Sequence, residues 1–513
     1  MTVVKSSVML AIASIILGIF GFFRYIVIAA FYGAYVISDA FMLAINIPVL
    51  LFGALGIAAA NCFLPQYQQA DEEGRDLFFS NVINLTLAAA IAVTLISALF
   101  PWVLVSLFAS QLDSAAFDVT VSLLRITLWI AIPIMLAALF QMYLQAKGVF
   151  FAQRIAMLFV HVCVIFAIIA GSATGNVYLL PSGLVIGYVL YALTLAFMTL
   201  RQGFSYRLQI NVYDEKIRTM SHLMRPMLFS IIAAEIHHVV DRNFASSLPA
   251  GSITLMTYAS RVSIQFHAFV GASVIYVMYP RMVRLASQGE YSGLINYVRK
   301  YLQKLVPLIL PFTVGLIILA EAIIFIIYER GAFTPEDTRI VAGILRMYAL
   351  GIGFHSFGIF LTKILLAVQD AKILIRLHLL TLGLSVVLNF ILIGPLQYFG
   401  LALSTSISAA FHTIILLWVI RKRFGSLDIS SLKNEWGKMF IATAVMGIIM
   451  GFGYRWLPLI DSGQLQTLAL IVVLAIVGVS VYVFVHMLLR SNFLRDCIGI
   501  VRNFTKKGIG DVK

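Results

Sequence analysis

Ionisable side chains inside long apolar stretches are the residues of this sequence best placed to do chemistry. A charge near the centre of a bilayer costs roughly 2.5–3.5 kcal/mol on insertion scales, so it usually faces a bundle interior or a water-filled cavity. The residues of this kind are Arg24, Asp39, Arg125, Glu235, Asp241, Arg242, Arg261, Glu321, Arg346 and Lys363. Arg125 and Glu321 lie near the ends of their stretches, where a long side chain reaches the interface, so we expect both to be structural.

Two of these residues lie close together in the sequence and carry opposite charges. Arg24 lies deep in the first apolar stretch, Asp39 lies near the start of the second, and a short hairpin at residues 32–35 joins the stretches. One interpretation is a structural ion pair. The other is a pair that separates when a cavity opens, and the sequence leaves both open.

Further ionisable residues fall in the apolar stretch at residues 224–245. At helical spacing, Glu235, His238 and Arg242 share one face of a helix, while His237 and Asp241 share another. Paired histidines in a membrane can relay protons, although such residues are more often polar groups satisfied by packing between helices. Glu235 and His238 are therefore candidates for a proton site, beside that structural alternative.

Signatures of catalysis are absent from the sequence. It has no glycine-rich phosphate loop with Lys-Ser or Lys-Thr, no HExxH motif and no GxSxG motif. Cys62, Cys163 and Cys497 show neither a disulfide framework nor metal-site spacing. We therefore expect a protein that is not an enzyme and has no cofactor of its own.

Long apolar helices must position these residues. The chain is 61% hydrophobic and 11% charged, with mean hydropathy +0.99, a balance outside that of soluble domains. A spanning helix needs about 20 mostly apolar residues, and about fourteen stretches qualify. They lie near 7–31, 36–62, 79–104, 120–145, 155–172, 179–200, 224–245, 253–280, 305–328, 338–366, 374–394, 398–420, 439–457 and 465–489. The sequence predicts an all-α polytopic membrane protein.

The distribution of positive charge predicts the orientation. Most of the 36 Lys and Arg fall in alternate gaps between the stretches and in the C-terminal tail, and the other gaps hold only Arg330, Arg339 and Arg455. By the positive-inside rule both termini of this multi-pass membrane protein are cytoplasmic. The net charge of +14 is thus explained by loops near anionic headgroups, and a nucleic-acid partner is not expected.

A weak internal repeat suggests the domain organisation. Similar residues open the second and eighth stretches and close the fourth and tenth, which favours two six-helix units over chance similarity. The predicted divisions are residues 1–223, residues 224–423, and residues 424–513 with two further helices and a basic tail. In transporters built from repeats the substrate path lies between the halves. Nothing in the sequence demands a second copy, so we expect a monomer.

Four blocks of sequence carry a resemblance to a known family. The first runs from Gly21 to Pro48 and contains Phe31-Tyr32-Gly33-Ala34 and Ser38-Asp39-Ala40-Phe41. The others lie at residues 240–261, which is the most specific block, at 328–334 and at 394–402. Together they resemble the lipid II flippase family, MurJ or MviN, of the multidrug/oligosaccharidyl-lipid/polysaccharide exporter superfamily. The resemblance covers nearly the whole chain.

The resemblance implies a flippase that carries lipid-linked peptidoglycan precursor, lipid II, to the outer leaflet by alternating access between two lobes. It also implies a cationic cavity for the diphosphate and sugar, and a groove at the last two helices for the polyprenyl tail. Arg24, Asp39 and Arg261 match positions that the family uses in or beside the cavity. Arginine suits a diphosphate because it is a fixed charge with a planar fork of donors.

The sequence departs from the family pattern at three positions. Gly18, Phe52 and Gly53 stand where family members usually carry arginine. The departures leave open a flippase with relocated phosphate contacts, an exporter of another polyprenyl-diphosphate-linked oligosaccharide, and a non-transporting paralogue or scaffold. A drug/cation antiporter of the same superfamily is less expected, because such antiporters usually have twelve helices.

The resemblance also suggests a coupling ion. Some family members bind sodium in the C-terminal lobe, and Asp241, Asn389 and Thr405 are the matching oxygen donors here. An asparagine is a weaker ligand than a carboxylate. Coupling to Na⁺, to H⁺ or to the membrane potential therefore stays open.

Overall fold

The structure is a computed structural model that describes residues 3–69, 71–267, 281–368, 371–425, 433–457 and 463–491. All regular elements in these ranges are helices. The chain divides into two compact units, the first formed by Met1–Leu255 with Arg330–Thr334 and the second by Met256–Glu329 with Pro335–Lys513. The predicted all-α fold class is thus confirmed.

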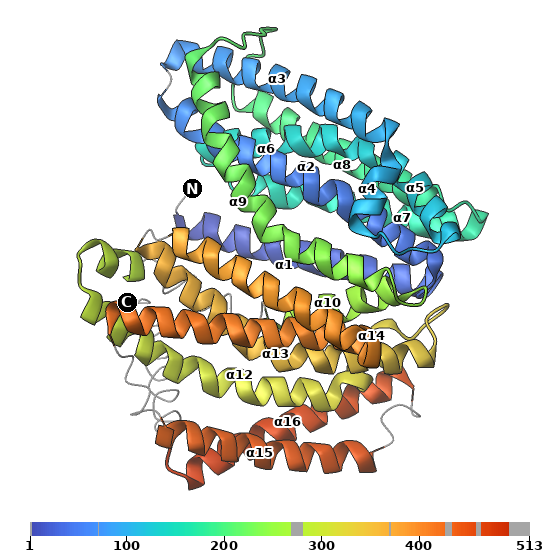
Figure 1. Ribbon diagram of the computed structural model, residues 1–513, viewed down its shortest axis with the longest axis vertical. Helices are drawn as coiled ribbons and strands as arrows, with labels where there is room; N and C mark the ends of the chain where they lie inside the picture. Colours follow the sequence, from blue (N-terminus) through green and yellow to red (C-terminus); the bar gives the residue numbers. More distant parts are fainter. Residues whose placement is uncertain are drawn as a thin grey trace, which may run out of the picture. The chain divides into compact units, whose positions relative to one another are not determined.

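The first unit contains the helices of the N-terminal half of the chain (Figure 1). They are α1 (Val3–Tyr32), α2 (Val36–Gln69), α3 (Glu72–Leu99), α4 (Pro101–Phe108), α5 (Ser114–Thr127), the 3-10 turn η1 (Leu128–Ile130), α6 (Ala131–Ala146), α7 (Ala152–Thr174), α8 (Leu179–Arg201), α9 (Glu215–Ala245) and the first turn of α10 (Ser252–His267). Helix α2 is the centre of this unit, because it packs against α5, α6 and α9. It is mostly buried and is apolar around most of its circumference, as a central helix must be.

An aromatic cluster packs around the C-terminal end of α2. Phe63 and Tyr67 of α2 pack with Phe79 of α3 and Tyr143 of α6, and Phe204 from the chain after α8 completes the cluster. The rings of Phe79 and Tyr143 stack with centroids 4.8 Å apart. This cluster joins four segments that are distant in the sequence.

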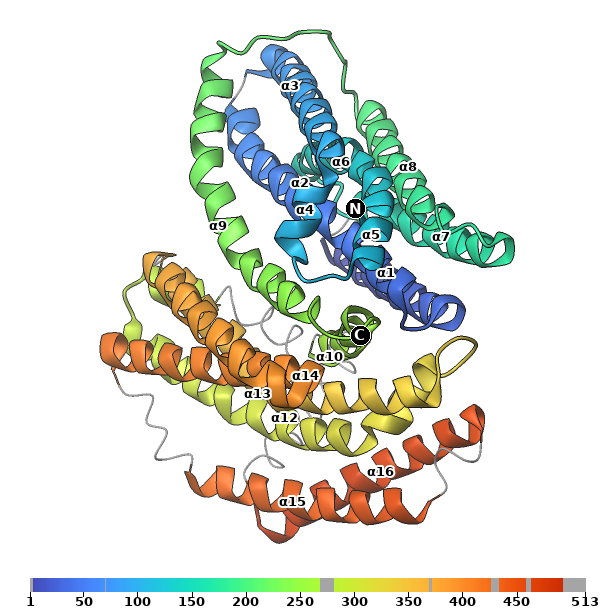
Figure 2. The ribbon, with the colours of Figure 1, turned by 45° about the vertical axis from the view of Figure 1, so that its right-hand side comes forward.

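The second unit contains the rest of α10, α12 (Tyr291–Tyr328), α13 (Pro335–Ala367), α14 (Ala371–Phe424), α15 (Lys433–Trp456) and α16 (Gln464–Leu488). Helix α13 packs against α12 and α14, and the α15–α16 pair packs against α12, as Figures 1 and 2 show. The basic residues expected in the tail, Arg495, Arg502, Lys506, Lys507 and Lys513, lie outside the described residues.

The predicted spans coincide with helices. Eleven helices in the described ranges are long and apolar enough to cross a membrane. One of them, α14, covers two predicted spans and contains a break at Gln397, where φ is 48°. Helices α9 and α10 cover two more, although the second half of the predicted span 253–280 lies outside the described residues. The predicted domain boundaries at 223 and 423 stay a prediction, and by packing α9 belongs to the first unit.

Candidate functional site

Asp39 is held by the start of helix α10. It lies in the first turn of α2, where it is 5% exposed. Its Oδ2 accepts a hydrogen bond from the Gly251 N–H at 2.7 Å, and its Oδ1 accepts from the Thr254 N–H at 2.7 Å and the Thr254 hydroxyl at 2.6 Å. The first N–H groups of a helix lack partners within the helix, and the helix dipole favours a negative charge there. Asp39 therefore caps α10 from another helix.

Two glycines let other segments approach the turn between α1 and α2. Gly251 has φ +94°, and a Cβ at this position would collide with the carbonyl oxygen of Ala34. Gly331 has φ +61°, and its Cβ would collide with the carbonyl oxygen of Ala30. The Ala332 N–H also donates to the Ala30 carbonyl oxygen at 2.8 Å. The α1–α2 turn is thus held by backbone contacts that only glycine permits.

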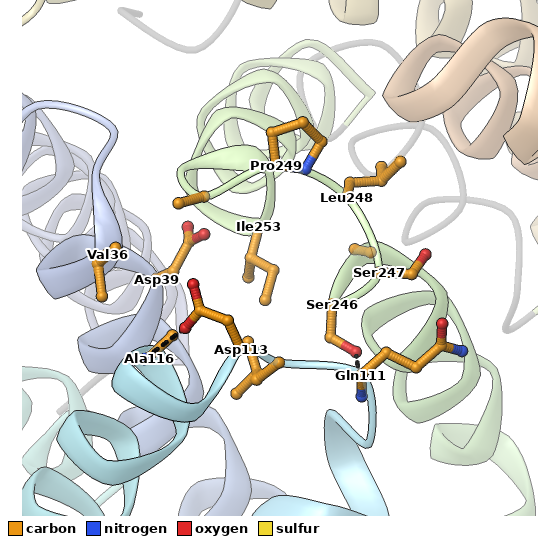
Figure 3. Close-up of a pocket in the computed structure, with 13 residues that line it drawn as sticks. Val36, Asp39, Gln111, Asp113, Ala116, Ser246, Ser247, Leu248, Pro249 and Ile253 are labelled. Carbon is orange, nitrogen blue, oxygen red and sulfur yellow. Dashed lines mark hydrogen bonds between the residues drawn. The ribbon is translucent and has the colours of Figure 1, made fainter.

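A polar cavity of about 320 Å³ lies beside Asp39 (Figure 3). Asp113 lines it and caps α5, because its side chain accepts a hydrogen bond from the Ala116 N–H at 2.6 Å. The Ser246 hydroxyl also lines it and accepts from the Gln111 N–H at 3.2 Å. Both carboxylates are therefore engaged with backbone amides where the ends of α2, α5, α9 and α10 line the cavity.

Arg24 lies on α1 with part of its guanidinium exposed. Its Nη2 donates to the Tyr25 hydroxyl at 3.1 Å, and its Cζ lies 4.9 Å from the centroid of that ring. Its charge also acts on His161 of α7 and Tyr188 of α8. The Nε atom has no hydrogen-bond partner within the described residues. Arg24 is therefore oriented by Tyr25, and its buried Nε keeps an unused donor within the described residues.

The structure pairs Arg24 and Asp39 with other groups. Arg24 contacts Tyr25, and Asp39 binds the start of α10. Among the described residues these two side chains form no ion pair with each other, so the ion-pair interpretation does not apply to this structure. Arg261, the third predicted substrate residue, lies half-buried on α10 in the second unit. The predicted role of all three in substrate binding stays a prediction.

The ionisable residues of α9 have the predicted helical arrangement. His237 Nε2 lies 3.6 Å from Asp241 Oδ2, one turn away on the same face. Glu235, Asp241 and Arg242 all act electrostatically on His238, which lies on the neighbouring face. The charges of these side chains therefore influence one another. A proton site at Glu235 and His238 stays a prediction.

The predicted cation ligands come from both units. Asp241 belongs to the first unit, whereas Asn389 and Thr405 lie on α14 in the second. Asn389 is fully buried, and the Thr405 hydroxyl donates to the Leu401 carbonyl oxygen at 3.1 Å. Among the described residues, no group of three or more His, Cys, Asp or Glu is arranged to hold a metal ion. A sodium site at these three residues stays a prediction.

One intramembrane ion pair was not foreseen. Arg346 of α13 lies 3.4 Å from Glu321 of α12, and its Nε donates to the Ile317 carbonyl oxygen at 3.2 Å. Sequence reasoning treated Glu321 as a residue that reaches the interface alone. The signal available was one acid and one base in consecutive predicted spans, which is too common to identify a pair.

The positions that depart from the family pattern have different environments. Phe52 is 2% exposed and belongs to the apolar core of the first unit. Gly53 faces Ile134 of α6, whereas a Cβ at Gly18 would meet no atom within 4 Å. The core has therefore been built around Phe52, while the surroundings of Gly18 still have room for a side chain.

Comparison with solved structures identifies the fold. An inward-facing multidrug resistance transporter of the MATE family, in the MOP superfamily, matches with a TM-score of 0.67 at 15% identity over 83% of this chain and 99% of that one. A structure described as lipid II flippase MurJ, inward closed conformation, matches with a TM-score of 0.81 at 24% identity over 96% and 100%. This chain therefore has the same helical fold as these two proteins.

Sequence comparison identifies the family. A protein of Rhizobium tropici named probable lipid II flippase MurJ is 26% identical over 99% of this chain and 97% of its own length. A Thermotoga maritima protein with the same name is 25% identical over 97% and 99%. The family model described as lipid II flippase MurJ matches residues 28–487. The chain belongs to the lipid II flippase MurJ family and is a multi-pass inner-membrane protein.

Proposed function

We propose that this protein moves lipid II from the cytoplasmic to the outer leaflet by alternating access. The observation that carries the proposal is the family match over residues 28–487, together with relatives of the same name that align over nearly their whole length. A match of this extent includes both units rather than one shared module. It favours one transport cycle over a reuse of the fold for another task.

Arg24 is the residue that we propose as a contact to the diphosphate. A guanidinium stays charged at every physiological pH, and its planar fork can bind two phosphate oxygens at once. Its Nε is free of partners within the described residues, and one Nη is oriented by Tyr25. Arg261 is proposed as a second contact. For Asp39 we propose an indirect role, because both of its carboxylate oxygens accept hydrogen bonds from Gly251 and Thr254 at the start of α10.

An alternative substrate is favoured by one observation. Phe52 occupies a buried position where the resemblance predicts an arginine, so this position contributes no positive charge to bind a diphosphate. Export of another polyprenyl-diphosphate-linked oligosaccharide would tolerate this loss if fewer phosphate contacts are needed. A non-transporting paralogue or scaffold would tolerate it entirely.

The orientation and the coupling ion are also proposals. The basic residues in alternate gaps support cytoplasmic termini. Coupling through a cation at Asp241, Asn389 and Thr405 or through a proton at Glu235 and His238 is supported by the residue types alone. A monomer that acts without a nucleic-acid partner fits both.

Complementation tests the proposed function. The host's own lipid II flippase is depleted while this chain is expressed, and both viability and outer-leaflet lipid II are measured. We expect rescue by the wild-type chain and loss of rescue with Arg24→Ala. The control variant Arg339→Ala, at an exposed arginine on the side opposite to the cytoplasm in the proposed orientation, should still rescue. Normal membrane levels of a wild-type chain that does not rescue would refute lipid II as the substrate.

A further inference from the structure

The chain between α8 and α9 is extended and lies against the beginning of α3 (Figure 2). Side chains of α3 bond to its backbone at alternate residues. The Ser205 N–H donates to Asp76 at 2.9 Å, the Arg207 N–H donates to the Ser80 hydroxyl at 3.0 Å, and the Asn84 amide donates to the Gln209 carbonyl oxygen at 2.8 Å. Asn81 then exchanges two hydrogen bonds with the backbone of Asn211, at 2.8 and 2.9 Å.

These bonds explain polar residues that a spanning helix would otherwise not carry. Ser80 and Asn81 are fully buried and Asn84 nearly so, although all three lie in an apolar helix. Non-helical backbone close to the hydrocarbon must have its polar groups satisfied by the protein, because lipid offers no hydrogen bonds. The polar face of α3 performs this task for residues 205–211, which indicates that this segment lies where water is scarce.

The α3 residues that bind residues 205–211 indicate how deep this segment lies in the membrane. The outer end of α3 is marked by exposed Phe100 and Trp102, as in an aromatic belt at the interface. About 20 residues at a rise of about 1.5 Å cross a hydrocarbon core of about 30 Å, so the inner edge of the core falls near Ser80. The bonds to Asp76 and Asn84 therefore place the segment on either side of that edge.

The Tyr206 hydroxyl donates to Asn84 Oδ1 of α3 at 2.6 Å, and several other apolar side chains of the segment are strongly exposed. Phe204 anchors the segment in the aromatic cluster, and beyond it the exposed fractions are 81% for Leu208, 66% for Ile210, 56% for Val212 and 92% for Tyr213. Exposed Arg201, Arg207 and Arg218 flank them. The nearby acids Asp76 and Asp214 are engaged with backbone N–H groups. An apolar ridge with exposed arginines at its sides is complementary to an anionic lipid surface.

We propose that residues 204–213 are an interfacial anchor, which inserts its apolar side chains into the cytoplasmic leaflet and binds anionic phospholipid headgroups through the flanking arginines. The anchor does not depend on which lipid-linked substrate is carried. The assignment to the cytoplasmic leaflet rests on the cytoplasmic termini proposed above. Insertion into a leaflet does not depend on that orientation. The anchor would fix the cytoplasmic end of α3 and the start of α9 at a constant depth.

Site-directed fluorescence tests the insertion. Cys62, Cys163 and Cys497 are replaced, a single cysteine at Leu208 or Ile210 is labelled with bimane, and the full chain is reconstituted in nanodiscs. The lipid reference is a label at Phe166, which is exposed on α7, and the aqueous reference is a label at Gln288 in an exposed turn. For the labels at Leu208 and Ile210 we expect quenching by shallow doxyl lipids to lie within twofold of the quenching at Phe166. We expect their quenching by iodide to be several-fold weaker than the quenching at Gln288. Iodide quenching equal to that at Gln288 at both positions would overturn the anchor and leave the ridge as a surface for a soluble protein.

Lipid composition tests the headgroup partner. We expect protection of the Leu208 label from iodide to weaken when phosphatidylglycerol is replaced by phosphatidylcholine. The double variant Arg207→Gln/Arg218→Gln should remove this difference, and the control Arg339→Gln should retain it. Equal protection in both lipids would overturn the anionic partner. Failure of lipid II complementation would leave these results unchanged, so the two proposals fail separately.

Discussion

The bond between Asp39 and α10 makes a quantitative prediction for the variant Asp39→Asn. The remaining carbonyl oxygen of asparagine can still accept from Thr254, but its NH₂ group then faces the Gly251 N–H, which loses its acceptor. A buried donor left without a partner costs about 1–3 kcal/mol, and loss of the negative charge at a helix start costs about 0.3–1 kcal/mol more. We therefore expect the start of α10 to lose about 2–3 kcal/mol of local stability.

Hydrogen exchange of the purified protein in nanodiscs measures this loss. Since about 1.4 kcal/mol is tenfold in an equilibrium constant, the amides of residues 251–255 should exchange roughly 30- to 150-fold faster in Asp39→Asn. The matched control is Asp113→Asn, which lines the same cavity but caps α5, so it should accelerate exchange at Ala116 and leave residues 251–255 unchanged. Unaltered exchange at 251–255 in Asp39→Asn would refute the capping role and favour direct substrate contact.

Three other predictions concern packing and charge. Gly331→Ala should lower thermal stability by more than Gly175→Ala. Both glycines have positive φ, which costs other residues about 1–2 kcal/mol, but only at Gly331 would a Cβ collide with a neighbouring carbonyl oxygen. Equal losses of stability would contradict the close approach at Gly331. In a double-mutant cycle, Glu321→Gln and Arg346→Gln should show a coupling of about 0.5–3 kcal/mol in unfolding free energy, and additive effects would argue against the ion pair. Gly18→Arg should leave the folded fraction in fluorescence-detected size-exclusion chromatography unchanged, because a side chain at this position meets no neighbouring atom. Phe52→Arg should reduce the folded fraction strongly, because a buried charge costs roughly 3 kcal/mol. Similar behaviour of both variants would mean that Phe52 is not a core residue.

Sequence patterns predicted the helices better than the contacts between them. Apolar stretches of about 20 residues have one stable form in a bilayer, so the spans could be located by composition alone. The predicted spans 374–394 and 398–420 both lie within α14, where the non-helical residue Gln397 separates two helices that meet at a kink. The polar helix α9 was placed correctly, but its packing with the first unit depends on contacts that no local pattern encodes.

The candidate site shows the same limit. Arg24 and Asp39 stood out because charge is costly in a membrane, yet their nearness in sequence suggested a pair that the structure does not contain. The real partner of Asp39 lies 212 residues away at Gly251, where it is a backbone amide and therefore invisible to residue type. Likewise Asn81 and Asn84 gave no functional signal, since an amide in a span has many uses and its partner here is the backbone of a distant segment.

The polar face of α3 has a consequence for the order of events during synthesis. Asn84 leaves the ribosome 125 residues before Gln209, its partner, does. At roughly 5–20 residues per second, α3 waits about 6–25 s with its asparagines unpaired. A helix with these amides at mid-membrane would be inserted poorly for that time, whereas amides at its cytoplasmic edge can be hydrated until the later segment arrives. Ser80, Asn81 and Asn84 lie in the half of α3 (Glu72–Leu99) nearer its start, so water at that side of the membrane can hydrate them until residues 205–211 are made.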